Sequence, residues 1–258
     1  MLADRCRILL GILAILALIF TFPQNTARDI DVNPFQWGTA STLQLGIAAH
    51  SFNARGLLVN TFLANAPQVL LSISYFTVNR IFTGMSSANE WNGLATFRKA
   101  LRVSKPEGDQ RGTYFLSLPY RWAVPLTIVS GLLHWLLSQS VFLVRLEIRD
   151  INGAIKPDDS RSTCGYSAFS IAIFVVSYLV LLAIILALML RQFEERLPFA
   201  GNCSLAISAA CHPPPEDVDA HLHPVKWGVV RSRYGGAIAH CTVTTEQVAN
   251  PVVGRQYA

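Results

Sequence analysis

Among the stretches of the sequence that contain no lysine, arginine, aspartate or glutamate, four stand out as possible membrane spans. They cover residues 8–22, 56–79, 122–144 and 162–190. An α-helix rises about 1.5 Å per residue, so about 20 apolar residues are enough to cross the hydrocarbon core of a bilayer. The last three stretches reach that length. The sequence therefore predicts an all-α membrane protein with three to four transmembrane helices.

The first stretch is the shortest, with 15 residues. It follows Arg5 and Arg7 and precedes polar residues, and this order is also typical of a signal peptide. Its cleavage pattern is poor, because Asn25 occupies the position two residues before Ala27. We expect residues 1–22 to form an uncleaved signal anchor or first transmembrane helix, with a cleaved signal as the alternative.

The remaining boundaries follow from the other stretches. We expect a connector at 23–55, a membrane region at 56–190 and a C-terminal tail at 191–258. The fourth stretch begins with polar residues that suit the membrane interface, so its helix is placed over the apolar part. The membrane region is expected to contain helices at about 56–79, 122–144 and 168–190, and a basic loop at 80–121.

Composition agrees with a membrane protein. Charged residues make up 14% of the chain, whereas a soluble domain usually has about 25%. The net charge of +5 comes from basic residues beside apolar stretches, which favours contact with anionic lipid at the basic loop rather than binding to nucleic acid. Five cysteines at low density do not predict a disulfide-built scaffold.

Basic residues also predict the orientation. If all four stretches cross the bilayer, eleven lysines and arginines flank them on the side of the N-terminus, the basic loop and the tail, and six on the other. Because short cytosolic segments are enriched in these residues, we expect the tail to be cytosolic, in the plasma membrane or an endomembrane. The glycosylation sequon at Asn202 tests this, since it is modified only if the tail is extracytosolic.

Polar residues recur at helical spacing inside two of the predicted helices. Steps of three or four residues place them on one helix face. This candidate inter-helix face consists of Asn65, Gln68, Ser72, Ser130, His134 and Ser138. Hydrogen bonds that join the helices are the favoured interpretation. A polar path through the membrane is the alternative, because His134 is the one ionisable residue deep within a predicted span.

The tail contains cysteines and histidines, residue types that bind zinc. No Cys-x-x-Cys pair is present, so we expect no metal site and no cofactor. Residues 225–230 and 240–245 have the composition of short strands. Three consecutive prolines at 213–215 and scattered glycines argue against a large core. The tail is therefore expected to be mostly irregular.

The basic loop is a candidate for the membrane interface. Apolar residues such as Phe97 and Leu101 alternate with Arg98, Lys99 and Arg102, whose side chains could reach lipid headgroups. Aromatic residues of an interfacial belt lie nearby, namely Trp91, Tyr114, Phe115, Tyr120 and Trp122. A solvated connector is an equally good interpretation.

Catalytic signatures are missing from the sequence. It contains no phosphate-binding loop, no Gly-x-Ser-x-Gly elbow, no His-Glu-x-x-His motif and no dinucleotide fingerprint. We therefore do not expect an enzyme.

Several strings of the sequence are distinctive. They are FLANAPQVLLS at 62–72, RKALRVS at 98–104, LPYR at 118–121, SGLLHW at 130–135, ISAACHPP at 207–214 and GRQYA at 254–258. On these strings the chain resembles the C-terminal half of a family of uncharacterised fungal multi-pass membrane proteins, which is defined by a domain of unknown function. The resemblance runs from about Gly38 to Ala258 and implies longer relatives with further spans.

The resemblance implies no activity and supplies no catalytic residue. We therefore expect a structural, assembly or sensing role in a membrane. The alternative is a transporter or channel component that uses a polar path around Asn65, Gln68 and His134.

Overall fold

A computed structural model gives the structure of the chain. It describes residues 11, 54–156, 159–190, 204–230, 239–252, 254, 255 and 257. The predicted anchor at 1–22, apart from Gly11, and nearly all of the connector lie outside these residues, as does Asn202. The chain divides into two compact units. We call them the helical unit (described residues 54–79 and 124–190) and the loop–tail unit (described residues 80–123 and 204–257).

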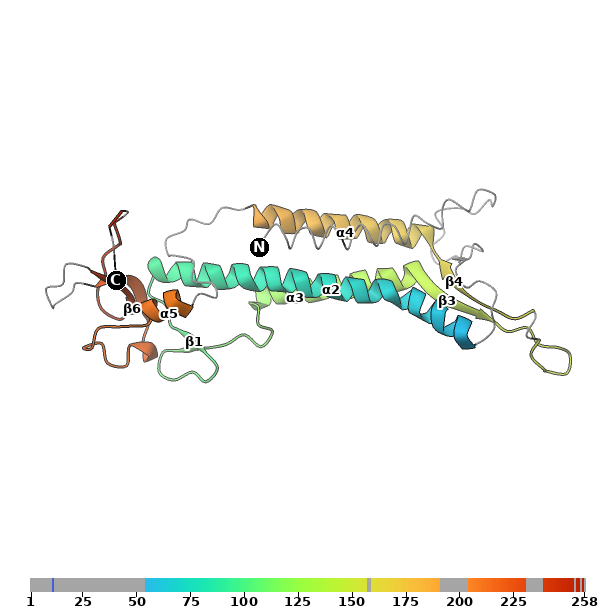
Figure 1. Cartoon of the computed structure of the whole chain (residues 1–258), viewed down its shortest axis with the longest axis horizontal. Helices are drawn as coiled ribbons and strands as arrows, with labels where there is room; N and C mark the ends of the chain where they lie inside the picture. The colour runs from blue at the N-terminus through green and yellow to red at the C-terminus, as the bar shows by residue number, and fades with distance from the viewer. Residues whose placement is uncertain are drawn as a thin grey trace. The chain divides into compact units, whose positions relative to one another are not determined.

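The first long helix is α2, Ala54–Asn92 (Figure 1). It continues well past residue 79, so the prediction of a loop over 80–92 is wrong. The physical reason is that the spacing of its buried residues does not break there, since Ser74, Val78 and Ile81 follow one another at steps of four and three. The helix ends before Gly93, where a short 3₁₀ turn, η2 (Gly93–Ala95), takes over.

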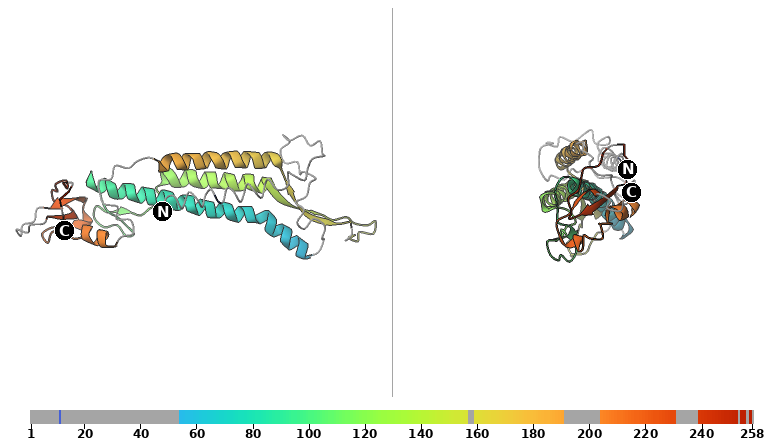
Figure 2. Two further views of the ribbon diagram at one scale, coloured as in Figure 1. Left: turned by 45° about the horizontal axis from the view of Figure 1, so that its top comes forward. Right: turned by 90° about the vertical axis from the view of Figure 1, so that its left-hand side faces the viewer.

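Two further helices belong to the apolar part of the chain. They are α3, Tyr120–Ser140, and α4, Ala168–Met189. Within the helical unit α2, α3 and α4 run side by side (Figure 2). The predicted helix at 168–190 matches α4 closely, whereas the one predicted at 122–144 ends early, at Ser140.

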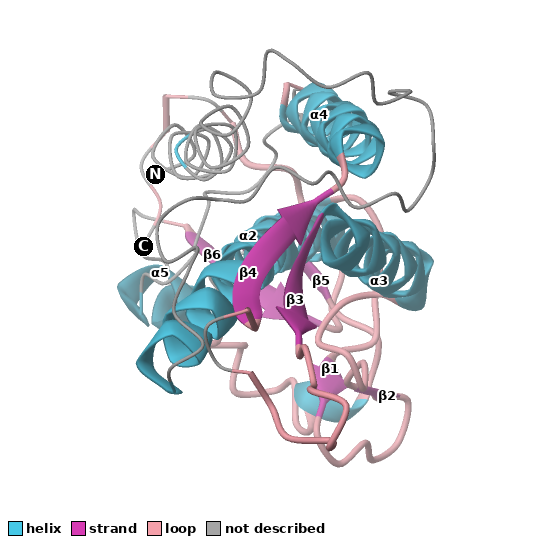
Figure 3. Ribbon diagram, turned by 90° about the vertical axis from the view of Figure 1, so that its right-hand side faces the viewer, coloured by secondary structure: helices cyan, strands magenta, loops and turns pink. Residues whose placement is uncertain are grey.

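A β-hairpin follows α3 where the sequence suggested helix and loop. Strand β3, Val141–Leu146, pairs antiparallel with β4, Arg161–Tyr166 (Figure 3). The β3 sequence is VFLVRL, and its β-branched and aromatic residues favour a strand over a helix end. An all-α description therefore omits this hairpin. The Ser167 N–H donates to the Ser140 carbonyl at 3.0 Å, which closes the hairpin at the start of α4.

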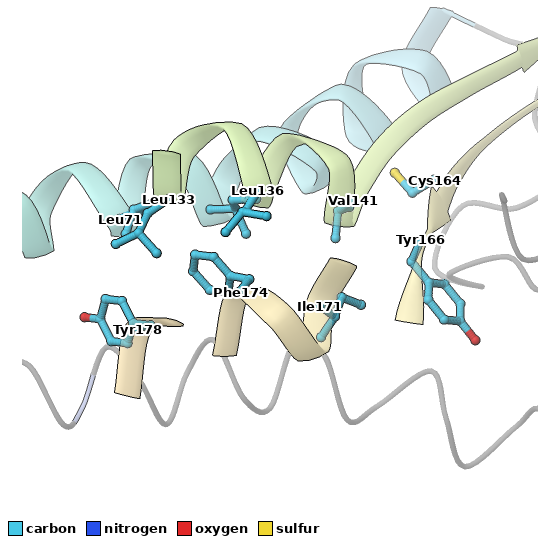
Figure 4. Packing of buried hydrophobic residues seen from close by; sticks show 10 residues of the cluster. Leu71, Leu133, Leu136, Val141, Cys164, Tyr166, Ile171, Phe174 and Tyr178 are labelled. Carbon is cyan, nitrogen blue, oxygen red and sulfur yellow. The ribbon is translucent and has the colours of Figure 1, made fainter. Parts of the chain in front are cut away.

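Apolar side chains from α2, α3, β3, β4 and α4 form the core of the helical unit. Figure 4 shows Leu71, Leu133 and Leu136 facing Phe174 and Tyr178 of α4. The buried members are Leu71, Leu133, Leu136, Leu137, Val141, Cys164, Tyr166, Ile171, Phe174 and Tyr178.

The loop–tail unit is built from two distant parts of the chain. From the loop come β1 (Arg102–Val103) and β2 (Arg111–Gly112), which pair in parallel. From the tail come α5 (Ser204–Ala210), η3 (Ala220–Leu222) and the antiparallel pair β5 (Lys226–Val230) and β6 (His240–Thr244). β5 and β6 coincide with the two runs that have strand composition.

Backbone hydrogen bonds join the loop to the tail. Lys99 and Val225 exchange both of their N–H···O bonds, at 2.9 and 3.0 Å, and the Asp109 N–H donates to the Leu222 carbonyl at 2.9 Å. A small core of Leu94, Ala210, Val225 and Trp227 lies between them. The expectation of a mostly irregular tail therefore underestimates its order, because the partner that orders it is a loop more than 100 residues earlier.

Candidate functional site

The first polar link in the helical unit joins α2 to α3. Nδ1 of His134 lies 2.7 Å from Oε1 of Gln68, and the Gln68 Nε2 donates to the His134 carbonyl at 3.3 Å. Both side chains are half-buried. The structure thus brings together two residues of the candidate inter-helix face.

Three other members of that face donate hydrogen bonds within their own helices. Asn65 and Ser138 are exposed, and each donates to a carbonyl of its own helix, Asn65 to Thr61 at 2.8 Å and Ser138 to Trp135 at 2.8 Å. Ser72 also donates within its helix, to the Gln68 carbonyl at 3.0 Å. The half-buried Ser130 lies on α3. Equal helical spacing therefore did not give a shared buried face.

A second link joins the start of α2 to the hairpin, and sequence reasoning missed it. Asn60 is fully buried, and its amide donates to the Ser162 carbonyl at 2.9 Å. The Cys164 thiol in turn donates to the Asn60 carbonyl at 3.1 Å. Burial raises the pKa of the Cys164 thiol, which keeps it neutral and able to donate. Asn60 thus ties α2 to β4 through both its side chain and its backbone.

A third link, also missed, joins α2 to α4. The hydroxyls of Ser74 and Tyr178 lie 2.6 Å apart, and both residues are almost fully buried. The Tyr178 ring stacks on Phe174 with centroids 6.0 Å apart. Tyr178 belongs to the apolar core shown in Figure 4.

One signal in the sequence could have found the missed links. From Asn60 onward, the buried positions of α2 are separated by steps of seven, four, three, four and three residues. They are Asn60, Pro67, Leu71, Ser74, Val78 and Ile81. A stripe that mixes apolar and polar residues indicates the buried face better than polar residues alone. Gln68 lies beside this stripe, next to the buried Pro67, and its side chain reaches His134 on α3.

Large apolar side chains are exposed along all three helices of the helical unit. On α2 the exposed fraction of Phe62 is 81% and that of Phe76 is 67%. Monomeric soluble proteins rarely expose continuous apolar surfaces of this kind. The others are Leu58, Val59, Val69 and Ile73 on α2, Val124, Ile128, Leu132 and Trp135 on α3, and Val176, Leu179, Val180, Ile184 and Leu186 on α4.

Charged residues of the helical unit gather on the hairpin and its turn. Arg145 pairs with Glu147 at 2.7 Å, and Lys156 pairs with Asp150 at 3.5 Å. These pairs are solvent-exposed, so each contributes little to stability. Within the described part of the chain, no three His, Cys, Asp or Glu side chains are grouped so that they could hold a metal ion.

By length and composition, two described helical segments could cross a membrane: Ala54–Ala95 and Phe169–Met189. Core helices of soluble proteins can meet the same criterion. α3 has 21 residues but is not among these segments, and its polar residues include His134, Ser138 and Gln139.

The domain of unknown function DUF8419 matches residues 8–255. The chain belongs to this family. The DUF8419 match begins at residue 8, earlier than the resemblance that starts near Gly38, and it covers nearly the whole chain. No curated protein and no solved structure matches the chain. Membership in DUF8419 therefore places the chain in an uncharacterised family and assigns no activity to Gln68, His134 or any other residue.

Proposed function

We propose that the chain is a multi-pass integral membrane protein with a structural, assembly or sensing role, in which α2, α3 and α4 cross the bilayer. The exposed apolar faces of these helices carry the proposal. Contact between these faces and water is unfavourable, whereas lipid chains can cover them in a membrane. The lengths agree: α3 and α4, with 21 and 22 residues, would extend about 32 Å, close to the thickness of the hydrocarbon core.

The three polar links would hold the bundle together. Between helices in lipid the hydrophobic effect is weak, so packing and hydrogen bonds determine which faces meet. Gln68–His134 joins α2 to α3, Ser74–Tyr178 joins α2 to α4, and Asn60 joins α2 to the hairpin. Each bond is expected to contribute about 0.6 kcal/mol. α2 is the helix common to all three links, which suits a structural role.

The loop–tail contacts support the proposed orientation. If α2, α3 and α4 all cross the bilayer, the loop after α2 and the tail after α4 are on the same side, and the hairpin is on the other. The hydrogen bonds between Lys99 and Val225 require the loop and tail to share a side. With the greater number of basic residues there, we propose that this side is the cytosol.

Glycosylation mapping tests both the spans and their orientation. The substitution Ala154→Thr converts the exposed Asn152-Gly153-Ala154 turn of the hairpin into a sequon. In a eukaryotic membrane system we expect glycan on Asn152 of this variant and none on the native sequon at Asn202. Asn152→Gln in the same variant is the matched control, and its mobility on a gel should not change after glycosidase treatment. Glycan on Asn202 would reverse the orientation.

Transport is a second candidate, because the half-buried pair Gln68 and His134 lies between two proposed spans. His134→Phe removes the ring nitrogens and keeps an aromatic ring. Reduced abundance of the variant in membranes favours the structural role, whereas normal abundance with the phenotype of a deletion strain favours transport. Ser138→Ala is the control, since Ser138 is exposed and donates only to the Trp135 carbonyl of its own helix.

A further inference from the structure

A tight turn in the loop–tail unit presents two apolar residues to the outside. The Ser117 N–H donates to the Tyr114 carbonyl at 3.2 Å, so Phe115 and Leu116 occupy the two central positions of the turn. Gly, Pro, Asn, Asp and Ser usually fill such positions. Here the exposed fraction of Phe115 is 87% and that of Leu116 is 43%. An aromatic and a leucine at the tip of a turn indicate a surface that contacts something other than water.

The turn is fixed on both sides. Before it, the Tyr114 hydroxyl accepts from Arg102 at 2.9 Å, and the Arg102 guanidinium lies 4.1 Å from the centre of the Tyr114 ring. After it, Leu118 is fully buried. Ser117 adopts a left-handed backbone conformation, with φ of 58°, which closes the turn. Contacts of Tyr114 and Leu118 therefore hold the turn in place, with Phe115 and Leu116 exposed at its tip.

The structure separates basic residues used internally from those available to a ligand. Arg98 donates to the carbonyls of Thr245 and Glu246 in the tail. Arg102 donates to Glu90 and to the Gly112 carbonyl. Because these groups are already bonded, Arg98 and Arg102 are poor candidates for the headgroup contacts that sequence composition suggested.

Arg111 and Arg121 remain on the two sides of the turn, and both are exposed. Neither forms an ion pair with a described residue, and residues 110–123 contain no aspartate or glutamate. The Arg121 guanidinium lies 5.8 Å from the ring of Trp122, which is partly exposed like Tyr120. Positive charge and aromatic rings thus surround the apolar tip.

We propose that residues 111–122 dock on the membrane surface, with Phe115 and Leu116 inserted between lipids and Arg111 and Arg121 bound to phosphates of anionic headgroups. The inference rests on the proposed function, because α3 begins at Tyr120 and a bilayer that contains α3 passes close to this segment. Charge favours anionic lipid, and tyrosine and tryptophan are enriched at this depth of the bilayer.

The depth of residue 115 tests the insertion. A fluorescent amino acid replaces Phe115 in the full chain, which is reconstituted in nanodiscs of phosphatidylcholine and phosphatidylserine. The matched control carries the same probe at Val218, which is also apolar and 74% exposed but is flanked by Asp217 and Asp219. We expect spin-labelled lipids to quench the probe at 115 strongly and the probe at 218 weakly. Equal quenching at both positions overturns the insertion, and a protein partner is then the better explanation of the exposed turn.

The headgroup preference tests the role of the arginines. We expect spin-labelled phosphatidylserine to quench the probe at 115 more than spin-labelled phosphatidylcholine does. This ratio should fall to about one when Arg111→Gln and Arg121→Gln are combined, since each basic residue near an anionic surface raises the local lipid preference about fivefold. Lys105→Gln, an exposed basic residue elsewhere in the loop, is the control and should leave the ratio unchanged. An unchanged ratio in the double variant overturns the phosphate contacts.

Carbonate extraction of cell membranes that contain the full chain separates this inference from the proposed function. Extraction of the full chain from the membrane contradicts the multi-pass protein itself. Retention of the chain together with weak quenching at 115 contradicts only the docking of residues 111–122.

Discussion

The helical unit and the loop–tail unit place their apolar and polar side chains in opposite ways. In the helical unit, large apolar residues such as Phe62 and Ile128 are exposed, and the polar groups Ser74 and Tyr178 meet inside. In the loop–tail unit, an apolar cluster around Trp227 is enclosed, while charged groups such as Asp217 and Arg98 bond near the surface. The two patterns fit the proposed function, in which lipid surrounds the first unit and water surrounds the second.

Under the proposed function, the same difference also decides what stabilises each unit. In water, burying an apolar side chain removes it from solvent, and this is the dominant favourable term. Between helices in lipid that term is largely absent, and close packing with a few hydrogen bonds remains. A core substitution in the loop–tail unit should therefore cost more than the loss of a polar link in the helical unit.

The largest effect is expected from Trp227→Ala. The Trp227 side chain is buried against Leu94, Ala210 and Val225, and truncating such a residue usually costs about 3–5 kcal/mol. Amide hydrogen exchange in the full chain should show lost protection in β5 and β6, with α4 unchanged. Val218→Ala is the control, because that side chain is exposed. A change below about 1 kcal/mol in β5 and β6 would contradict a water-facing core in this unit.

An intermediate effect is expected at Asp217. The Asp217 carboxylate accepts from the Thr245 N–H at 2.8 Å and from the hydroxyls of Thr244 and Thr245. Burial raises the pKa of Asp217, but these hydrogen bonds and the charge of Arg98 outweigh burial and hold the pKa below its ordinary value. Asp217→Ala should cost about 1–3 kcal/mol, because it leaves Thr244 buried without its acceptor.

The lowered pKa gives this contribution a definite pH dependence. The native state binds the proton less readily than the unfolded chain, whose aspartate pKa is about 3.9. The stabilisation is therefore complete above that value and is lost as the pH falls through the lower, native pKa. Exchange of the Thr245 amide should accelerate over this window relative to Asp217→Ala, in which the dependence should be weaker. The same acid response in both proteins would show that Asp217 is not responsible.

A smaller effect is expected from the hydrogen bond between Ser74 and Tyr178. A double-mutant cycle with Ser74→Ala and Tyr178→Phe in nanodiscs should give a coupling energy of about 0.6 kcal/mol. The control cycle pairs Tyr178→Phe with Thr77→Ala, because Thr77 donates to the Ile73 carbonyl of its own helix, and its coupling should be close to zero. Coupling of several kcal/mol would indicate a link far stronger than transmembrane hydrogen bonds usually are.

Sequence reasoning located the helices better than their ends. Uncharged stretches found α4 nearly to the residue and the apolar parts of α2 and α3. The prediction ended α2 before Arg80, although Arg80 is exposed and the stripe of buried residues continues through Ile81. A charge on the exposed face of a helix does not end it. Conversely, an uncharged stretch need not be helical throughout, so the lack of charge after Ser140 did not reveal the strand β3.

The candidate site was predictable only in part. Gln68 and His134 were found because a polar residue within an apolar helix usually has a partner on another helix. Asn60 and Ser74 were not, since recognising them requires the buried face of α2 to be known first. The assembly of the loop with the tail was also unpredictable, because the Lys99–Val225 pairing joins segments with no shared sequence pattern. Long-range pairing depends on the whole fold.

The smallest effect is expected from Asn65→Ala. The Asn65 side chain is exposed, and its amide donates to the Thr61 carbonyl of the same helix. If lipid surrounds this face, alanine removes a polar group from an apolar medium and strengthens helix propensity, so stability in nanodiscs should stay within about 0.5 kcal/mol or rise slightly. Gln68→Ala, which removes the bond to His134, should be the more destabilising of the two. Normal abundance of the Asn65→Ala variant with the phenotype of a deletion strain would instead indicate that Asn65 faces a polar path. In that case lipid does not cover the whole exposed face of the helical unit, and the contrast between the two units does not hold at Asn65.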